Sequence, residues 1–296
     1  MNVSVNEQEY VFVADAISDK ESRESYFVLI EKVFGLDFRP WYKSGFCNNC
    51  FIPYTLFSSN IAVASVGIVI NNFMWRNEQK RYAQISTVAT DPDYRGRGLG
   101  RWLTERALDE WRDKCDCVYL YANDTVVDYY PKFGFLKAHE YRYHKPLKPS
   151  NGMFRKLDMS VQSDVELLIK KHRKSNPFSL FTMDDCVEIM MFHCITFLRD
   201  SIYYIEKYDA VVIAEQEGDD MFCYDIYSDG NSAIDDLLGI VASEETYAVT
   251  LGFTPVDSSG FTAEIANESD TTFFVLNDKE NILADNRITF PFLSRA

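Results

Sequence analysis

The chain has 296 residues, of which 47% are hydrophobic and 15% aromatic, and this composition excludes disorder over most of its length. Its length favours two domains of near-equal size, each able to bury a core. Residues 1–150 carry 19 Lys and Arg against 19 Asp and Glu, so the whole net charge of -15 belongs to residues 151–296. This balance argues against nucleic acid or an anionic membrane as a partner, because both require clustered basic residues.

The N-terminal segment and the cysteines bear on where the protein works. Residues 1–7 have neither the basic nor the apolar segment of a secretory signal, and the longest apolar run is too short to span a bilayer. Seven cysteines without an export signal indicate reduced thiols, and we expect a cytoplasmic protein. The pairs Cys47/Cys50 and Cys115/Cys117 are not spaced as partners in a zinc finger and have no His nearby in sequence, so no metal ligand is expected.

The first half alternates strand and helix patterns. A strand is predicted over residues 10–14 and a helix over residues 22–34. The aromatic stretch at residues 38–46 is too apolar for a free loop, and we expect it to line a pocket. Residues 61–70 and 81–90 are rich in Val, Ile and Thr and are predicted to be neighbouring antiparallel strands. The later elements are expected as one helix and two strands at residues 99–111, 118–121 and 137–143.

The best linker is the Pro- and Gly-containing stretch at residues 145–152, where the charge balance also changes. We therefore predict an α/β (α+β) protein with domains at residues 1–147 and 148–296. The first domain is expected to be a mixed sheet flanked by helices, and the second an acidic α/β domain with a smaller sheet. The second half repeats the order of elements in outline, so it is either a diverged duplicate of the first or a different small α/β domain.

The clearest chemical signal is the glycine loop at residues 95–100, which joins a predicted strand to a predicted helix. Such a loop brings successive backbone N–H groups and the positive end of the helix dipole to one point, which is an anion site. The loop lacks the Gly-Lys-Ser/Thr of a P-loop, and its glycine spacing is not that of a dinucleotide fold. A glycine turn without a ligand is the alternative interpretation.

At this loop the sequence resembles the GCN5-related N-acetyltransferase (GNAT) family, over about residues 10–145. Arg95, Gly98 and Gly100 match the family's Arg/Gln-x-x-Gly-x-Gly/Ala pyrophosphate loop, and Asn123 followed by YYPKFGF is similar to a second family motif. The resemblance implies a GNAT-like sheet and a catalytic domain that takes acetyl-CoA as co-substrate. If the second half is a duplicate, it would be a degenerate GNAT-like domain, because its corresponding turn lacks the glycine loop.

The resemblance also implies roles for single residues. The backbone of Val88 and Thr90 would pair with the pantetheine arm, and Asn123 would hydrogen-bond the cofactor. Tyr130 would be the general acid, since a phenol with a pKa near 10 can protonate the departing CoA thiolate. Packing in an aromatic turn is the alternative for Tyr130. The residues expected on the pyrophosphate are Arg95, Gly96, Arg97, Gly98, Leu99 and Gly100.

The general base is left open by the sequence. Gln84 stands where histone-type members of the family carry a Glu, and a Gln side chain cannot accept a proton. Either another group is the base, or the amine arrives already neutral. The apolar residues 290–293 predict a packed tail that carries the Ala296 carboxylate, which is a candidate base, while a purely structural tail is the alternative.

The leading hypothesis is an N-acetyltransferase that moves an acetyl group from acetyl-CoA to the primary amine of a small, cationic acceptor by direct attack. We expect the acceptor between the aromatic residues 38–46 and the acidic residues 215–220, because an aromatic and a negative wall suit a cation. The alternative is a non-catalytic acetyl-CoA- or CoA-binding sensor or partner-binding module, which the missing carboxylate at Gln84 favours. The sequence predicts neither the identity of the acceptor nor the oligomeric state.

Overall fold

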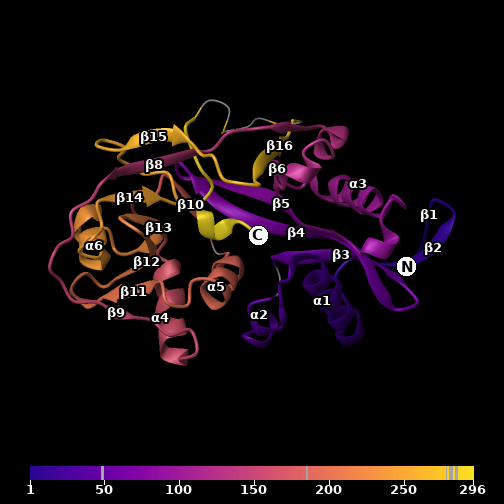
Figure 1. The fold of residues 1–296 in the computed structure, drawn as a ribbon, viewed down its shortest axis with the longest axis horizontal. Helices are drawn as coiled ribbons and strands as arrows, with labels where there is room; N and C mark the ends of the chain where they lie inside the picture. The colour runs from indigo at the N-terminus through magenta and orange to yellow at the C-terminus, as the bar shows by residue number, and fades with distance from the viewer. Residues whose placement is uncertain (48–49, 185, 278, 280–282, 284–285) are drawn as a thin grey trace.

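The computed structural model covers residues 1–296 and describes all of them except residues 48–49, 185, 278, 280–282 and 284–285. Two β-sheets form the molecule, and helices lie against both of them (Figure 1). This arrangement confirms the predicted fold class, a mixed sheet flanked by helices followed by a second α/β sheet.

Nine strands among the described residues make the first sheet: β1 (Asn2–Val5), β2 (Gln8–Val13), β3 (Phe51–Ser58), β4 (Ile61–Trp75), β5 (Glu78–Thr90), β6 (Cys117–Ala122), β7 (Phe135–Lys137), β10 (Phe181–Met183) and β16 (Thr272–Leu276). They lie in the order β1-β2-β3-β4-β5-β6-β16-β7, with β10 paired to one end of β4. Neighbours are antiparallel except for the parallel pair β5 and β6. Strand β4 is buried along most of its length because both of its faces are covered.

The α-helices of the described chain are α1 (Lys20–Phe34), α2 (Arg39–Lys43), α3 (Leu99–Trp111), α4 (Gln162–His172), α5 (Val187–Thr196) and α6 (Ile234–Val241). Short 3-10 turns occur at η1 (Pro92–Tyr94), η2 (Asp124–Val126), η3 (Tyr130–Phe133), η4 (Glu206–Tyr208) and η5 (Phe292–Ser294). Helix α3 lies on one face of the first sheet, and α1 and α2 lie on the other (Figure 1). None of the described helices is long and apolar enough to cross a membrane.

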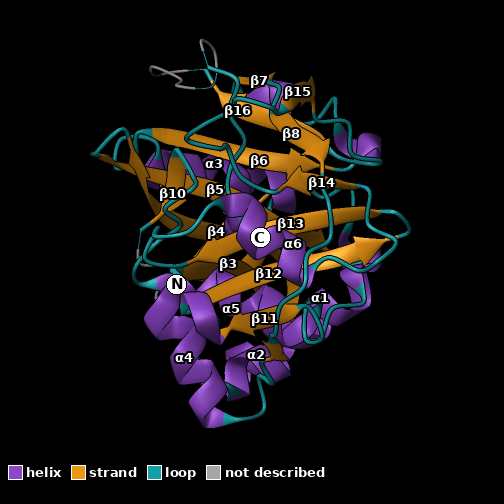
Figure 2. Cartoon of the chain, turned by 90° about the vertical axis from the view of Figure 1, so that its left-hand side faces the viewer, coloured by secondary structure: helices purple, strands orange, loops and turns teal. Residues whose placement is uncertain are grey.

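Seven strands of the described chain make the second sheet: β8 (Tyr141–Pro146), β9 (Arg155–Lys156), β11 (Ile202–Ile205), β12 (Ala210–Glu217), β13 (Asp220–Tyr227), β14 (Ala248–Leu251) and β15 (Thr262–Ile265). Their order is β15-β8-β14-β13-β12-β11-β9, and the pair β13 and β14 is parallel. In both sheets a long antiparallel pair is followed by one parallel pair, and a helix connects the parallel strands. Figure 2 shows α2, α4 and α5 gathered at one end of the molecule.

The two halves of the chain exchange strands. Strand β8, from the first half, lies between β14 and β15 of the second sheet. Strand β16, from the second half, lies between β6 and β7 of the first sheet. The predicted division into residues 1–147 and 148–296 stays a prediction about folding units, because each sheet is completed by a strand from the other side of that boundary.

An aromatic core also joins the two halves. The rings of Tyr119 and Phe290 stack with their centroids 4.2 Å apart, and Phe73 stacks on Phe181 at 4.6 Å. Each pair combines a strand of the first sheet with a segment that follows residue 150. Such ring pairs add about 0.5–1.5 kcal/mol beyond the area that they bury, so the contact between the halves is part of the folded core.

Candidate active site

The site begins where two parallel strands separate. β5 and β6 pair only from Tyr82 with Cys117 to Ile85 with Leu120, although β5 continues to Thr90. We call the space between residues 86–90 of β5 and the end of β6 the first gap. Backbone N–H and C=O groups that line such a gap lack a neighbouring strand and can pair with an extended ligand.

A bulge in β5 shapes one side of the first gap. Gly67 of β4 pairs with Ser86 and Ser65 pairs with Ala89, so one residue of β4 faces both Thr87 and Val88. Thr87 has a φ of 43°, a conformation that β-branched residues seldom adopt and that is often found at functional sites. The bulge twists β5 locally and turns the backbone at Val88 away from the ladder with β4.

Gly67 makes this bulge possible. A Cβ at that position would lie 2.3 Å from Thr87 Oγ1 and 2.7 Å from a ring carbon of Phe51. Gly67 was not among the predicted site residues. A glycine inside a strand rich in Val, Ile and Ala is the signal that could have found it, because such a residue marks a bulge or a close approach of two backbones.

A cavity of about 730 Å³ occupies the first gap and extends to the glycine loop. Most of the residues that the sequence analysis predicted for the site line it together: Val88, Thr90, Arg95, Gly96, Gly98, Leu99, Gly100, Asn123 and Tyr130. Val33 and Phe34 of α1 line it as well and were not predicted. Two predicted residues, Arg97 and Ala296, are not among the lining residues.

The glycine loop joins β5 to the N-terminus of α3. Gly96 and Gly98 have φ values of 76° and 77°, and Gly98 is the residue that precedes the helix. Both conformations favour glycine, and Gly98, Leu99 and Gly100 at the N-terminus of α3 line the cavity, where a helix N-terminus can bind an anion. The guanidinium of Arg97 instead donates to the carbonyl oxygen of Asp93 at 2.8 Å, and Arg97 does not line the cavity.

An ion pair holds the start of the loop. Asp91 Oδ1 and Oδ2 accept hydrogen bonds from Lys32 Nζ at 2.9 and 2.8 Å, and Asp91 Oδ1 also accepts one from the backbone N of Asp93 at 3.0 Å. The Lys32 ammonium holds the pKa of Asp91 below its usual value. Because Lys32 belongs to α1, the contact fixes the loop to a helix on the opposite face of the sheet from α3.

Tyr130 begins the turn η3 and lies in the wall of the cavity. Its side chain is 5% exposed and packs among the rings of Tyr129, Phe135 and Phe274. Burial raises the pKa of the Tyr130 phenol above its ordinary value, so the phenol is protonated at neutral pH and is able to donate a proton or a hydrogen bond.

Asn123 follows β6 directly. Its Nδ2 donates to Asp270 Oδ2 at 2.8 Å, and the next backbone N, of Asp124, donates to Asp270 Oδ1 at 2.7 Å. Asp270 lies just before β16, so a residue of the second half orients the amide of Asn123 at the rim of the cavity. No local sequence pattern points to Asp270, because its role depends on the strand exchange.

The last residue described, Ala296, lies on Gln84. Gln84 Nε2 donates to the main-chain O of Ala296 at 2.7 Å, and Gln84 Oε1 accepts from the N of Ala296 at 3.1 Å. Gln84 is fully buried, whereas Ala296 is exposed. The side chain of Gln84 therefore holds the backbone of residue 296 in place, and the C-terminus lies in the middle of the molecule (Figures 1 and 2).

Two further hydrogen bonds fix the tail before Ala296. Asn71 Nδ2 donates to the carbonyl oxygen of Ser294 at 3.0 Å, and His193 Nε2 lies 2.7 Å from the carbonyl oxygen of Arg295. Burial lowers the pKa of His193 to about 4, so the ring is neutral at pH 7. Since a carbonyl only accepts, Nε2 carries the proton and donates it.

The side chain of Arg295 is buried as well. It donates to Glu140 Oε2 at 2.6 Å and to Glu268 at 2.9 and 3.0 Å, and its guanidinium carbon lies 4.5 Å from the centre of the Tyr121 ring. Tyr121 is also one of the residues that line the cavity of the first gap. The tail is thereby held against the wall of the candidate cofactor site.

The second sheet has a matching divergence of strands. β13 and β14 pair only over residues 220–223 and 248–251, although β13 continues to Tyr227. The tail enters this second gap, where the N of Phe292 donates to the carbonyl oxygen of Gly252 at 2.8 Å. A Cβ on Gly252 would lie 3.1 Å from Phe292 Cβ, so glycine permits the close approach.

The aromatic stretch at residues 38–46 does not take the place predicted for it. Phe38 and Trp41 are 3% and 2% exposed, and both rings pack against Phe192 of α5 at 5.5 and 5.0 Å. The Trp41 indole N–H donates to the carbonyl oxygen of Glu188 at 3.0 Å. The prediction that these rings form a wall of an acceptor pocket is wrong, because they are needed to fill the core between α2 and α5.

The comparisons with known proteins agree with this geometry. Residues 15–135 match the model of the acetyltransferase (GNAT) family, a stretch that includes β3 to β6, the glycine loop and Tyr130. A search of the curated proteins gives no match. Among solved structures, a protein of unknown function from Enterococcus faecalis, named a probable N-acyltransferase, is similar with a TM-score of 0.57 and 13% identity over 90% of this chain and 72% of that chain.

Two GCN5-related N-acetyltransferases have the same fold. The structure from Anabaena variabilis has a TM-score of 0.56 and 15% identity, covering 90% of this chain and 72% of that one. The structure from Kribbella flavida has a TM-score of 0.53 and 18% identity, covering 90% and 71%. At sequence identities of 13–18%, these similarities show a shared fold and do not show a shared substrate.

The separated parallel strands and the glycine loop at the start of α3 form a cavity at a helix N-terminus, where a phosphate-bearing cofactor can bind. Residues 15–135 form a domain that matches the acetyltransferase (GNAT) family, whose members use acetyl-CoA, and the protein is an acyltransferase. The resemblance found in the sequence is thus confirmed.

Proposed function

We propose that the protein transfers an acetyl group from acetyl-CoA to the primary amine of a small, cationic acceptor. The observation that carries the proposal is the cavity of about 730 Å³ in the first gap, because both sequence motifs and the bulge of β5 meet there. The backbone of the glycine loop would bind the pyrophosphate, and the backbone of Val88 and Thr90 would pair with the pantetheine arm. Asn123 would hydrogen-bond the cofactor at the rim.

The reaction would be a direct attack. The amine nitrogen adds to the thioester carbon, and a backbone N–H near Val88 would stabilise the oxyanion. When the tetrahedral intermediate collapses, the C–S bond breaks and the thiolate leaves with a proton from Tyr130. The buried, protonated phenol supports this role.

The neutral amine nitrogen becomes positively charged when it adds to the thioester carbon and must then lose a proton to a base, and we assign this role to the Ala296 carboxylate. One main-chain oxygen of Ala296 accepts from Gln84, and a free carboxylate has a second oxygen for the proton. Two observations support the assignment. Ala296 is exposed, and hydrogen bonds to the carbonyl oxygens of Ser294 and Arg295 hold the tail that precedes it. Gln84 would then be a positioning residue, which explains why an amide suits a position where a carboxylate would repel the tail.

A steady-state assay of CoA release with mono- and diamines of graded charge tests the transfer. We expect amine-dependent CoA release, an equal amount of N-acetylated product by mass spectrometry, and a preference for cationic acceptors. If no amine raises CoA release above hydrolysis while acetyl-CoA still binds, the protein is the alternative, a CoA-binding module without turnover.

Extending the chain by one Gly after Ala296 tests the base. The extension converts the carboxylate of residue 296 into an amide and leaves the Gln84 contacts possible, so kcat should fall while acetyl-CoA affinity stays unchanged. One extra Gly before the exposed Met1 is the matched control. Full activity of the C-terminally extended protein would remove the tail from the mechanism and leave it a structural role.

A further inference from the structure

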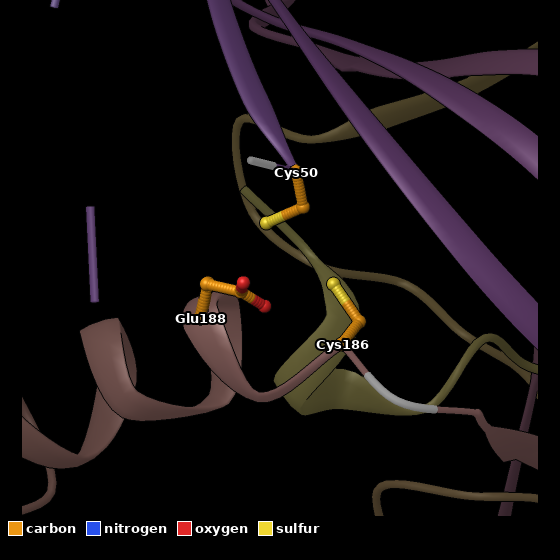
Figure 3. A group of neighbouring side chains, drawn as sticks. All are labelled: Cys50, Cys186 and Glu188. Carbon is orange, nitrogen blue, oxygen red and sulfur yellow. The ribbon is translucent and has the colours of Figure 1, made fainter. Parts of the chain in front are cut away.

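Three metal-ligating side chains from both halves of the chain meet far from the glycine loop in sequence (Figure 3). Cys50 precedes β3, Cys186 is the residue before α5, and Glu188 lies in the first turn of that helix. The two Sγ atoms and a carboxylate oxygen of Glu188 all lie within 4.8 Å of one another. Figure 3 shows the two sulfur atoms and the carboxylate turned toward a common point.

The spacing and the donor types fit one divalent transition metal. Zinc takes thiolate sulfur at about 2.3 Å and carboxylate oxygen at about 2.0–2.2 Å in a tetrahedron, which places neighbouring ligand atoms about 3.3–3.8 Å apart. Side-chain rotations that move these atoms by about an ångström would bring atoms that lie within 4.8 Å to those separations. Two soft thiolates with one carboxylate favour zinc over magnesium or calcium, which prefer oxygen alone.

The three candidate ligands are more buried than the carboxylates that cluster on protein surfaces without binding a metal. Cys50 and Cys186 are buried and Glu188 is half-buried, which leaves solvent access on the glutamate side. A divalent cation would displace the thiol protons, and the positive end of the α5 dipole would add to the stabilisation of a Cys186 thiolate.

We propose that Cys50, Cys186 and Glu188 bind one zinc-like divalent metal ion per chain, with a solvent molecule as the fourth ligand. The ion would connect β3, in the GNAT domain, to α5, in the second half. By fixing the start of α5 it would also hold this helix in place, and α5 carries His193, which contacts the carbonyl oxygen of Arg295 in the tail. This site goes beyond the proposed acetyl transfer and does not depend on it.

Cobalt titration of the reduced, metal-free full-length protein tests the site. Co²⁺ bound by two thiolates in a tetrahedron gives a sulfur-to-metal charge-transfer band and intense visible bands. We expect these bands to saturate at one Co²⁺ per chain, to disappear when zinc is added in competition, and to accompany a rise in Tm. A protein that takes up no Co²⁺ in this form would overturn the proposal.

Variants locate the ion. Cys50→Ser and Cys186→Ser should each remove the charge-transfer band, and Glu188→Gln should weaken Co²⁺ binding by at least about tenfold, since even the partners of a ligand contribute that much. The matched control is Cys194→Ala, because this buried thiol lies on the same helix but donates toward Met190 Sδ. Circular dichroism checks that each variant folds.

Two results would contradict the site even in folded protein. One is Co²⁺ binding by Cys50→Ser and Cys186→Ser that equals the wild type, which would place any ion elsewhere. The other is a disulfide between Cys50 and Cys186, found by mass spectrometry in protein isolated with zinc in the medium, which would make the pair a redox couple.

Discussion

The two sheets diverge at matching places, but only one of the two gaps is open. In the first gap, β5 and β6 separate after Ile85, and a cavity of about 730 Å³ follows. In the second gap, β13 and β14 separate after Cys223, and Phe292 of the tail fills the space. The same strand order therefore leaves a cavity in the first gap, whereas the C-terminal tail of the chain occupies the second gap.

The turn before α3 in the first half favours an anion, whereas the turn before α6 in the second half does not. Gly96 and Gly98 open the first turn, and the first turn of α3 contains no acidic residue. In the second half, Pro177 lies 3.1 Å from where a Cβ of Gly230 would be, and Asp235 and Asp236 occupy the first turn of α6. Two carboxylates at a helix N-terminus already satisfy its dipole and would repel a pyrophosphate.

The largest expected effect is a loss of acetyl-CoA binding when a charged side chain is placed in the glycine loop of the first gap. Gly98→Asp adds a side chain and a negative charge where the backbone turns at a φ of 77°, so acetyl-CoA binding measured by calorimetry should be abolished. Gly230→Asp is the matched control in the second half, since Gly230 has a φ of 74°. It should leave acetyl-CoA affinity unchanged in folded protein, and equal losses in both variants would refute the assignment.

Removing the Tyr130 hydroxyl comes next. Tyr130→Phe should lower kcat about ten- to a thousandfold with little change in acetyl-CoA affinity, as expected for a general acid. Tyr129→Phe is the control, because Tyr129 lines the same cavity and its hydroxyl lies 3.5 Å from Thr104 Oγ1. If both variants keep full kcat across pH, Tyr130 only packs and water protonates the thiolate.

A smaller effect is expected at the bulge. Gly67→Ala would force Thr87 to move, because the new Cβ would lie 2.3 Å from Thr87 Oγ1. We expect a loss of stability of about 1–3 kcal/mol and a weaker acetyl-CoA affinity. Gly239→Ala, whose Cβ would lie 2.8 Å from Ser150 Oγ, is the control for steric crowding outside the site. It should lower stability and spare acetyl-CoA binding, and an unshifted affinity in Gly67→Ala would show that the bulge is not needed.

The last prediction concerns the pH dependence of stability from His193, which contacts the carbonyl oxygen of Arg295 in the tail. His193 has a pKa of about 4 in the folded protein against the ordinary value of 6.5 in an unfolded chain, so below pH 6.5 the unfolded state binds more protons. The stabilisation from neutral His193 is therefore complete above pH 6.5 and is lost as the pH falls through about 4. Compared with His193→Gln, which keeps a donor but does not titrate, the wild type should lose relative stability between about pH 7 and pH 4 in urea unfolding. A constant difference would contradict the buried, neutral ring.

Some elements of the fold and of the candidate site could be predicted from the sequence. Strand β4, helix α3 and the glycine loop follow from local patterns, because Val- and Ile-rich runs, helical spacing and positive-φ glycines act within a few residues. The separate predictions that Gln84 cannot accept a proton and that residues 290–293 form a packed tail also came from local patterns. The contact between Gln84 and Ala296 at 2.7 Å does not follow from a local pattern, since it joins residues 212 positions apart.

The rest depends on long-range packing. β16 pairs in the first sheet and β8 in the second, and no pattern within either strand specifies its partner. The same holds for Cys50 and Cys186, which are 136 positions apart in the chain, whereas the sequence analysis considered only the pairs Cys47/Cys50 and Cys115/Cys117 and expected no metal ligand. The aromatic stretch was assigned to a pocket because aromatic rings serve both cores and binding sites, and only the place of α5 decides between them.

The stoichiometry of acetyl-CoA binding tests the central claim most directly. Calorimetry of the full-length protein should give one site per chain, because the first gap is open and the tail fills the second. A stoichiometry of two would mean that both gaps bind cofactor, and an absence of binding would mean that the first gap is not a cofactor site. Either result would contradict the account.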